Sequence, residues 1–317
     1  MIHIHDICTS LRAAEYEDWQ VATRRNAPSH LDIRLLWTFD TPAEMWMVTF
    51  SPDGLYLAAG GYRYVHFFEA KTGARIFSLV EEGENEQISH VVPSISFSPD
   101  GRSIATGVSD SYISIWNVED RTLIKRLKTS SPIASLVFSN DGKLLLSGSA
   151  DNKIWLWDVS LEIPILKLSL PESTDPRSII TSVAISSCGK FVAAVKTNDN
   201  RVHIWETATG TLVESLTGHV GVGHASLAFP PCRESWLNGL RESPTDVQRY
   251  IESRNQMDSI VPDDVCEIGG RQWSPDGHYL FYGDWDGSFH VWSADGVRQA
   301  TVVDAHSKFG TSNVILT

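Results

Sequence analysis

Short stretches in which apolar and polar residues alternate recur along the chain, and turn residues separate them. The runs SISF (94–97) and ASLVF (134–138) show this alternation. Each is followed, after a turn, by a second apolar run that ends in small residues, as in SIATG and LLLSGS. A period of two within short segments is typical of β-strands, because helical segments repeat their apolar positions at three and four residues. The pattern therefore predicts an all-β protein.

The turn between the paired strands repeats. SPDG occurs at 51–54, 98–101 and 274–277, and the variants SNDG and SSCG stand at 139–142 and 186–189. In SPDG, Pro presets φ, Asp bonds its own backbone and Gly accepts a positive φ, which together indicate a tight turn. Successive turns begin 47, 41, 47 and 88 residues apart, and the last gap spans two repeats. A period of about 40–45 residues indicates four-stranded β-propeller blades.

Four of the repeats also carry an aspartate six residues before a tryptophan. This spacing identifies WD-repeats, and LWD at 156–158 is the nearest match to the signature dipeptide. We expect each aspartate to accept backbone N–H groups in the turn between the second and third strands, and each tryptophan to pack between blades. Only one GH pair stands before a first strand, at Gly218–His219, so no blade is expected to hold a complete His–Ser/Thr–Asp–Trp network. The Asp–Trp pairs are Asp110 and Trp116, Asp151 and Trp157, Asp199 and Trp205, and Asp286 and Trp292.

Two repeats depart from the pattern. In the first blade Phe68 replaces the tryptophan and the turn aspartate is missing. In the fifth, Phe229 keeps the place of the aromatic residue before the turn, but an irregular insertion follows at about 233–265. Ser243, Pro244 and Asp246 favour a short helix there. The alternative is a degraded strand at 247–251.

The two ends of the chain set the expected number of blades. Residues 304–317 read as the first strand of a seventh blade, and the strand at 18–23 is expected to pair with the C-terminal blade, which would remove exposed edges. We therefore predict a propeller over residues 18–317 with seven blade positions, the seventh incomplete, and a tail at 1–17. A closed six-bladed ring is the alternative.

Charge and cysteine usage narrow the class of protein. The net charge is −13, from 39 acidic and 26 basic residues, which is a poor match for phosphate backbones and predicts no direct nucleic-acid binding. Four cysteines without CxxC spacing indicate reduced thiols. No apolar run is long enough to span a membrane, and the start lacks the regions of a signal peptide. We expect a soluble intracellular protein that binds no membrane.

Catalytic and metal-binding motifs are missing. GxSxG, GxxxxGK[ST], HExxH and GxGxxG do not occur, so the chain is predicted not to be an enzyme and to need no cofactor. His3 and His5 in HIHDIC alternate as on one strand face, but no second pair of ligands accompanies them, so no metal site is predicted. Scattered channel residues could still form a propeller active site, which converging carboxylates or histidines would indicate.

Residues 18–73 resemble the opening of the Groucho/Tup-type transcriptional corepressor propeller, nearest its fungal branch. The resemblance rests on DWQVATR, NAPSHLDIRLL, VTFSPDGLYLAAGG, a third strand without tryptophan, the KTG turn and the polar run EEGENEQISH. It extends to about residue 220 and is strongest in SISFSPDGRSIATGVSDSYISIWNVEDRTLI. It implies a nuclear protein-binding scaffold that recruits repression machinery. A generic adaptor, such as a ubiquitin-ligase substrate receptor or a cytoplasmic signalling scaffold, is the alternative.

Partner-binding residues are expected on the face that carries the loops between blades and between second and third strands. Two positions in each repeat point there: four residues before the aromatic of the first strand, and just before the turn aspartate. Tryptophan and tyrosine at such positions are favoured hot-spot types. The acidic chain predicts basic peptides or helices as partners. The candidates are Trp46, Tyr62, Arg63, Tyr64, Pro93, Ser109, Asn198 and Trp285.

Overall fold

The computed structural model describes the residues that form the strands of the chain and most of the links in its first two thirds. The described residues are 2–8, 20–23, 32–39, 45–81, 91–161, 163–168, 170, 178–197, 199, 201–217, 227, 229, 268–273, 279–284, 289–293 and 298–303.

Contacts divide the chain into two compact units. The larger unit contains four antiparallel sheets of four strands each, and the strands of each sheet are neighbours in sequence order. The all-β prediction and the four-stranded repeat are thus confirmed. The sheets consist of β4 (Met45–Phe50), β5 (Tyr56–Gly61), β6 (Tyr64–Glu69) and β7 (Arg75–Val80); β8 (Ser94–Phe97), β9 (Ser103–Val108), β10 (Tyr112–Asn117) and β11 (Thr122–Lys128); β12 (Ile133–Phe138), β13 (Leu144–Ser149), β14 (Ile154–Asp158) and β15 (Pro164–Leu168); and β16 (Ile180–Ile185), β17 (Phe191–Lys196), β18 (Arg201–Glu206) and β19 (Leu212–Thr217).

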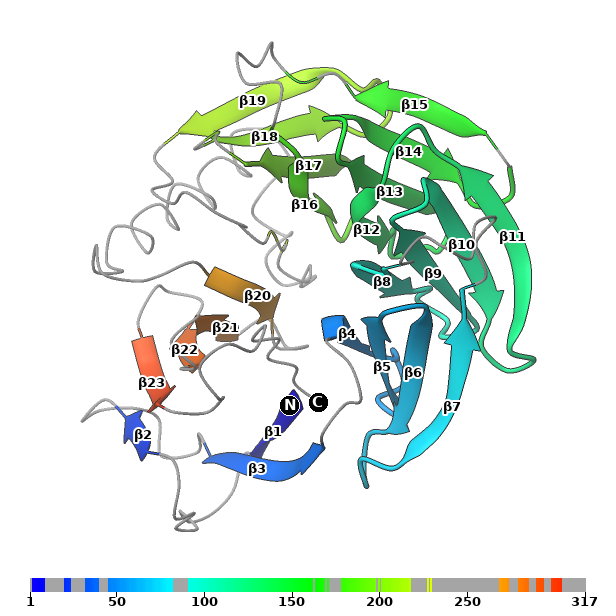
Figure 1. The fold of residues 1–317 in the computed structure, drawn as a ribbon. Helices are drawn as coiled ribbons and strands as arrows, with labels where there is room; N and C mark the ends of the chain where they lie inside the picture. Colours follow the sequence, from blue (N-terminus) through cyan, green and yellow to red (C-terminus); the bar gives the residue numbers. More distant parts are fainter. Residues whose placement is uncertain are drawn as a thin grey trace. The chain divides into compact units, whose positions relative to one another are not determined.

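The first strands of neighbouring sheets contact one another, and Figure 1 shows the fourth strands along the outside of this unit. Side chains from adjacent sheets fill the space between them. Trp157 of the third sheet, for example, packs with Ile113 and Leu127 of the second, and Trp205 of the fourth sheet packs with Leu156 of the third. Each sheet thus buries its apolar face against the sheet before it.

The repeated SPDG turn joins the first two strands of each sheet, as predicted from its residues. In the second sheet the Ser98 hydroxyl donates to the Asp100 carboxylate at 2.6 Å, and the same carboxylate accepts the Arg102 amide at 3.1 Å. Gly101 has a φ of 70°, in the left-handed region that favours glycine. In the fourth sheet Cys188 takes the place of the aspartate, and its Sγ lies 3.3 Å from the Ser186 hydroxyl.

Serines of the first strands connect neighbouring sheets. In each case the serine hydroxyl accepts a backbone amide from the next repeat, 42 to 48 residues later. The equivalent position of the first sheet is Met47, which has no hydroxyl to offer. The amides of Leu136, Val183 and Leu227 donate to Ser94, Ser135 and Ser182 at 2.9, 3.1 and 2.9 Å.

A glycine near the end of the second strand allows this close approach. A Cβ on Gly148 would lie 2.3 Å from the Ile180 side chain, and one on Gly107 would lie 2.7 Å from that of Ile133. The small residues that end SIATG and LLLSGS are therefore required by the first strand of the following sheet.

The smaller unit contains two sheets. The strands β20 (Ile268–Trp273), β21 (Tyr279–Asp284), β22 (Phe289–Ser293) and β23 (Arg298–Val303) form a meander, and β2 (Gln20–Thr23) extends it by pairing antiparallel with β23. The two-stranded sheet pairs β1 (Ile2–Cys8) with β3 (Asp32–Phe39).

The structure describes strands near both ends of the chain, where the sequence analysis predicted a tail and a closing strand. The predicted tail contains the strand β1, which pairs with a partner more than twenty residues later in the chain. The strand predicted at 18–23 forms β2 and pairs with β23, the outer strand of the sixth repeat. Its predicted pairing with residues 304–317, like the insertion at 233–265, lies outside the described residues. The number of blades stays a prediction.

Candidate functional site

Two tyrosines lie where β5 ends and β6 begins: Tyr62 in the link and Tyr64 as the first residue of β6. Their side chains are 39% and 42% exposed, whereas most residues of the two strands are buried. Arg63 between them has a φ of 59°, and its carbonyl accepts the backbone amide of Glu81 at 2.8 Å. This bond ties the link to the residue that follows β7.

Stacking holds the ring of Tyr64. Its ring lies 5.4 Å from that of His66, nearly parallel at 11°, and His66 meets the edge of Phe68 at 6.4 Å. Nδ1 of His66 lies 2.6 Å from the Ser78 hydroxyl of β7. Burial, with a smaller contribution from Arg75, lowers the pKa of His66, so this histidine is neutral at pH 7. Tyr64 thus stands at the exposed end of a fixed row of rings.

A short segment between the first two sheets gathers further candidate residues around these tyrosines. Val91 forms an antiparallel bridge with Tyr62, and its carbonyl accepts the Ser109 amide at 3.0 Å. The Val91 amide donates to the Ser109 hydroxyl at 3.0 Å. The next amide, of Val92, donates to the Gly61 carbonyl. Pro93, half-buried, follows directly. Tyr62, Pro93 and Ser109 are therefore brought to one place.

Trp46 lies at a β-bulge of β4. The pairing of β4 with β5 shifts between Met45 and Met47, which face Gly61 and Gly60. The same shift occurs at Ala134 and Thr181 in the third and fourth sheets. A bulge breaks the alternation of a strand at the extra residue. This explains why the position four residues before the first-strand aromatic differs from its neighbours. We call Tyr62, Arg63, Tyr64, Pro93 and Ser109 the tyrosine surface, and Trp46 stays a further candidate because its side chain lies outside what the structure describes. Asn198, Trp285 and Asp286 lie outside the described residues.

The tryptophans of the Asp–Trp pairs lie buried beside hydroxyl groups. Trp157 is 2% exposed and its Nε1 donates to the Ser147 hydroxyl at 2.9 Å. Nε1 of Trp116 donates to the Glu81 carboxylate at 3.0 Å, and the Thr106 hydroxyl lies 3.4 Å away. Trp205 is fully buried. Only the backbone of Trp292 is described, within β22.

The sequence analysis missed Glu81. Its side chain is fully buried and accepts hydrogen bonds from Thr106 and Trp116 on one oxygen and from Ser114 on the other. Burial raises the pKa of Glu81, and these hydrogen bonds limit the rise. Glu81 follows the outer strand β7 directly, just as Gly218 of the GH pair follows β19. The position directly after an outer strand was therefore the sequence feature that could have identified Glu81.

The turn aspartates make contacts with side chains. Burial alone would raise the pKa of Asp151, but hydrogen bonds from Lys153, Ser149 and Ser130 outweigh it and lower the pKa to about 2. These partners are side chains, so the prediction of backbone N–H donors is wrong for Asp151. Asp110 lies half-buried beside Ser111, whose φ is 66°.

Asp199 belongs to a buried network of a different kind. Its carboxylate lies 3.1 Å from both Lys196 Nζ and His203 Nε2, and Nδ1 of His203 lies 2.8 Å from the Ser215 hydroxyl. A hydroxyl, an imidazole and a carboxylate in sequence resemble a hydrolase relay. Here His203 is only 1% exposed and Lys196 neutralises the carboxylate, so the network connects β17, β18 and β19 rather than facing a substrate.

The residue types on the first strands bear on the alternative that the protein is an enzyme. Over β4, β8, β12 and β16 they carry no Asp, Glu, His, Lys or Arg. Within the described part of the chain, no three His, Cys, Asp or Glu residues could share a metal ion. No helix among the described residues is long and apolar enough to cross a membrane. The converging carboxylates or histidines that would indicate a propeller active site do not lie on these four strands.

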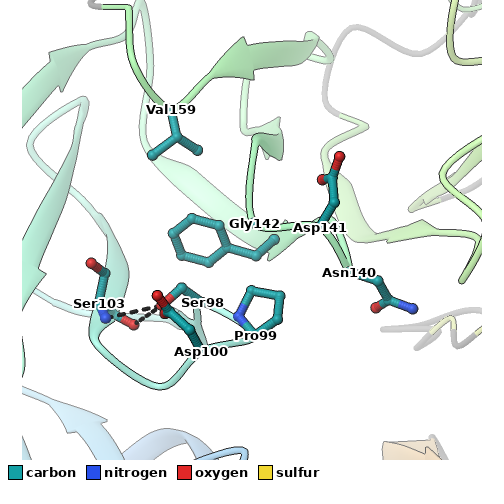
Figure 2. Close-up of a pocket in the computed structure, with 9 residues that line it drawn as sticks. Ser98, Pro99, Asp100, Ser103, Asn140, Asp141, Gly142 and Val159 are labelled. Atoms are coloured by element: carbon teal, nitrogen blue, oxygen red, sulfur yellow. Dashed lines mark hydrogen bonds between the residues drawn. The ribbon is translucent and has the colours of Figure 1, made fainter.

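A cavity of about 470 Å³ lies between the SPDG turn and its SNDG counterpart. Figure 2 shows the two turns beside each other, with Val159 across from them. Each carboxylate bonds within its own turn: hydrogen bonds from Ser98 and the Arg102 amide lower the pKa of Asp100, and Asp141 is held in the same way. The lining follows from the repeat of the turns and contains no nucleophile or base in a working arrangement. It consists of Ser98, Pro99, Asp100, Ser103, Phe138, Asn140, Asp141, Gly142 and Val159.

Comparison with known proteins agrees with this geometry. The model of the WD domain, G-beta repeat, matches residues 121–158, 167–206 and 263–293, and that of the anaphase-promoting complex subunit 4 WD40 domain matches 69–135. A crystal structure of the Myceliophteria thermophila Cps50 (Swd1) β-propeller domain covers 80% of this chain, and the match takes in 67% of that chain, with a TM-score of 0.53 and 14% identity. The chain has the fold of a WD-repeat β-propeller.

Curated relatives of the propeller have different roles. The general transcriptional corepressor tupA of Dictyostelium discoideum is 31% identical over 106 residues, which cover 33% of this chain and 18% of the relative. The ribosome biogenesis protein WDR12 homolog of Ixodes scapularis is 30% identical over 108 residues, 31% of this chain and 24% of the relative. The propeller chain thus matches about a fifth of the length of these relatives, and they show WD repeats rather than one shared role.

Proposed function

We propose that this propeller is a corepressor-like scaffold of the nucleus that recruits regulatory proteins through the tyrosine surface. The observation that carries the proposal is that Tyr62 and Tyr64 are exposed although the backbone around them is paired with Val91 and Glu81 and the ring of Tyr64 stacks on His66. Rigid exposed aromatic side chains lose little conformational entropy when a partner covers them, which makes them effective hot spots.

The corepressor role is supported by the tupA relative and by the resemblance of residues 18–73 to the Groucho/Tup-type propeller. Net charge supports basic segments as the partners, because an acidic protein attracts them at long range. Ribosome assembly is a second candidate role, since the WDR12 homolog matches a similar share of the chain. A nuclear location is compatible with both roles.

The test combines a pull-down with a melting curve. We expect alanine at Tyr62, Tyr64 and Trp46 to leave the melting temperature nearly unchanged and to weaken partner binding. A true hot spot contributes about 2 kcal/mol, or roughly thirtyfold in affinity. Binding should weaken further as salt rises. The matched control is Leu55→Ala, which removes a side chain 60% exposed in the turn between β4 and β5.

The partners recovered by the unaltered protein separate the two roles. Transcription factors and repression machinery would support the corepressor role, and preribosomal proteins would support the second. An unchanged set of partners for the tyrosine-surface variant, with unchanged melting, would show that this surface is not where partners dock.

A further inference from the structure

Exposed large apolar side chains gather on the outer strands of the propeller. Among the residues whose exposure the structure describes, eleven large apolar side chains are exposed, and eight of them lie on outer strands or in the link just before β15. Single exposed apolar residues are ordinary, but their concentration on one kind of strand is not expected by chance. The eight are Ile76, Val80, Leu123, Ile124, Leu161, Ile163, Ile165 and Leu212.

Three of these residues occupy the same structural position. The pairing of the third strand with the outer strand shifts register once in every sheet, which leaves one extra residue on the outer strand. The extra residue is Ile76 in β7, Ile124 in β11 and Ile165 in β15, and these side chains are 43%, 50% and 47% exposed. The bulge therefore directs one isoleucine per sheet outward, at intervals of one repeat.

Protection of the sheet edge does not explain these isoleucines. A bulge on an edge strand discourages pairing with other chains, and charged or polar side chains do so too. An exposed isoleucine has the opposite effect, because it offers apolar surface to other molecules. Gln299 fills the equivalent position of β23, which shows that the bulge accepts a polar residue.

The same outer strands are basic. In a chain with 39 acidic and 26 basic residues, β7, β11 and β15 contain five cations and no carboxylate. Lys125 Nζ donates to the Val159 carbonyl at 2.9 Å, and the Lys167 ammonium lies 5.7 Å from the centre of the Trp155 ring, so two of these charges are held close to the strands. The fourth outer strand, β19, instead contains Glu214 and no cation. The five are Arg75, Lys125, Arg126, Lys128 and Lys167.

We propose that the outer strands β7, β11 and β15 bind an acidic segment of a partner protein that also carries aliphatic side chains. Its aliphatic groups cover Ile76, Ile124 and Ile165, and its carboxylates pair with the neighbouring cations. Charge complementarity selects this occupant over a basic one. The surface is made by other strands than the tyrosine surface and prefers the opposite charge, so one propeller engages two kinds of partner.

The test uses the full chain and a fluorescent synthetic peptide in which leucine alternates with aspartate. A second peptide, with lysine in place of aspartate, is the control for charge. Anisotropy titrations should show tighter binding of the acidic peptide, weakened by salt. Serine at Ile76, Ile124 and Ile165 together should weaken binding about tenfold, because burial of the aliphatic groups is lost. Val213→Ser at the bulge of the acidic strand β19 should leave binding unchanged.

A charge variant keeps the test independent of folding. Lys128→Glu with Lys167→Glu retains every isoleucine and should also weaken the acidic peptide about tenfold, with an unchanged melting curve. Equal affinity for both peptides, or full binding by either variant, would overturn the proposal. Sedimentation of the protein without peptide tests whether a second copy of this chain covers the surface instead. A dimer that the serine variant abolishes would assign the surface to that second copy and would also overturn the proposal.

Discussion

The indole of Trp116 donates its N–H to the buried carboxylate of Glu81 at 3.0 Å, and the two residues belong to different sheets. Trp116 lies in β10 of the second sheet, and Glu81 follows the last strand of the first. Thr106 and Ser114 complete the shell of donors around the same carboxylate. Trp116, the tryptophan of the second sheet, is therefore bonded to the repeat before it, and the contact between the first two sheets depends on a polar group as well as on packing.

Removal of this carboxylate should destabilise the protein. Glu81→Ala leaves the buried N–H of Trp116 without its acceptor, which we expect to cost about 2–3 kcal/mol in the free energy of unfolding. Glu81→Gln keeps one acceptor oxygen and nearly the same volume, so it should cost less than half as much. Urea titration of both variants measures the difference. Equal losses for alanine and glutamine would mean that volume, rather than hydrogen bonding, is what Glu81 contributes.

Stability should depend on pH through Asp151. Its pKa is about 2 in the folded protein against an ordinary value of 3.8, so the folded state favours the ionised form. The stabilisation is present above about pH 4 and is lost as pH falls towards 2. Asp151→Asn should flatten this part of the stability curve relative to the unaltered protein. Parallel curves for the two proteins through that range would contradict the assignment. Glu81 acts with the opposite sign, because its raised pKa favours the neutral form and costs stability as pH rises.

Trp157 tests the packing between sheets. Its side chain is 2% exposed among residues of the second sheet, so Trp157→Ala should cost about 3–5 kcal/mol. Ser147→Ala, which removes only the acceptor of its N–H, should cost about 1 kcal/mol. Denaturant titration gives both values. A loss below about 2 kcal/mol for the alanine variant would show that Trp157 is not a core residue.

A substitution in the fourth turn should stabilise the protein. Cys188 stands where the other turns carry an aspartate that bonds a serine hydroxyl and a backbone amide. Cys188→Asp restores both bonds and should stabilise the protein by about 1 kcal/mol. Cys188→Ala removes the thiol without supplying the bonds and serves as the control. A melting temperature for the aspartate variant at or below that of the alanine variant would refute this.

Local chemistry explains which features could be predicted from sequence. The SPDG turns and the alternating strands depend on residues within a few positions of each other, so their pattern alone indicated the four-stranded sheets. The link 62–64 was found in the same way, as the interval between two strands. The position of Trp46 was identified from its spacing to Phe50, although the bulge that makes the position special was visible only in the register with β5.

Contacts between repeats explain what was missed. Glu81 lies in the polar run EEGENEQISH, and nothing within that run shows that Trp116, 35 residues later, donates to it. The partners of Asp151 include Ser130, 21 residues earlier. The bulges of the outer strands place Ile76, Ile124 and Ile165 outside the alternation that predicts which side chains are buried. In each case the deciding partner belongs to another strand, which periodicity cannot identify.

The serine bonds between first strands also bear on how such a chain can change in length over evolution. Each of Ser94, Ser135 and Ser182 meets an amide of the following repeat, and that amide stands at one fixed depth in its own strand. An insertion or deletion of one residue in a first strand would carry the hydroxyl past its amide and turn the neighbouring side chains to the opposite face. A change in the length of a loop, or the gain or loss of a whole repeat, keeps donor and acceptor aligned, since the three bonds span 42, 48 and 45 residues. Duplication of complete units, with drift confined to the loops, is the route that this architecture leaves open.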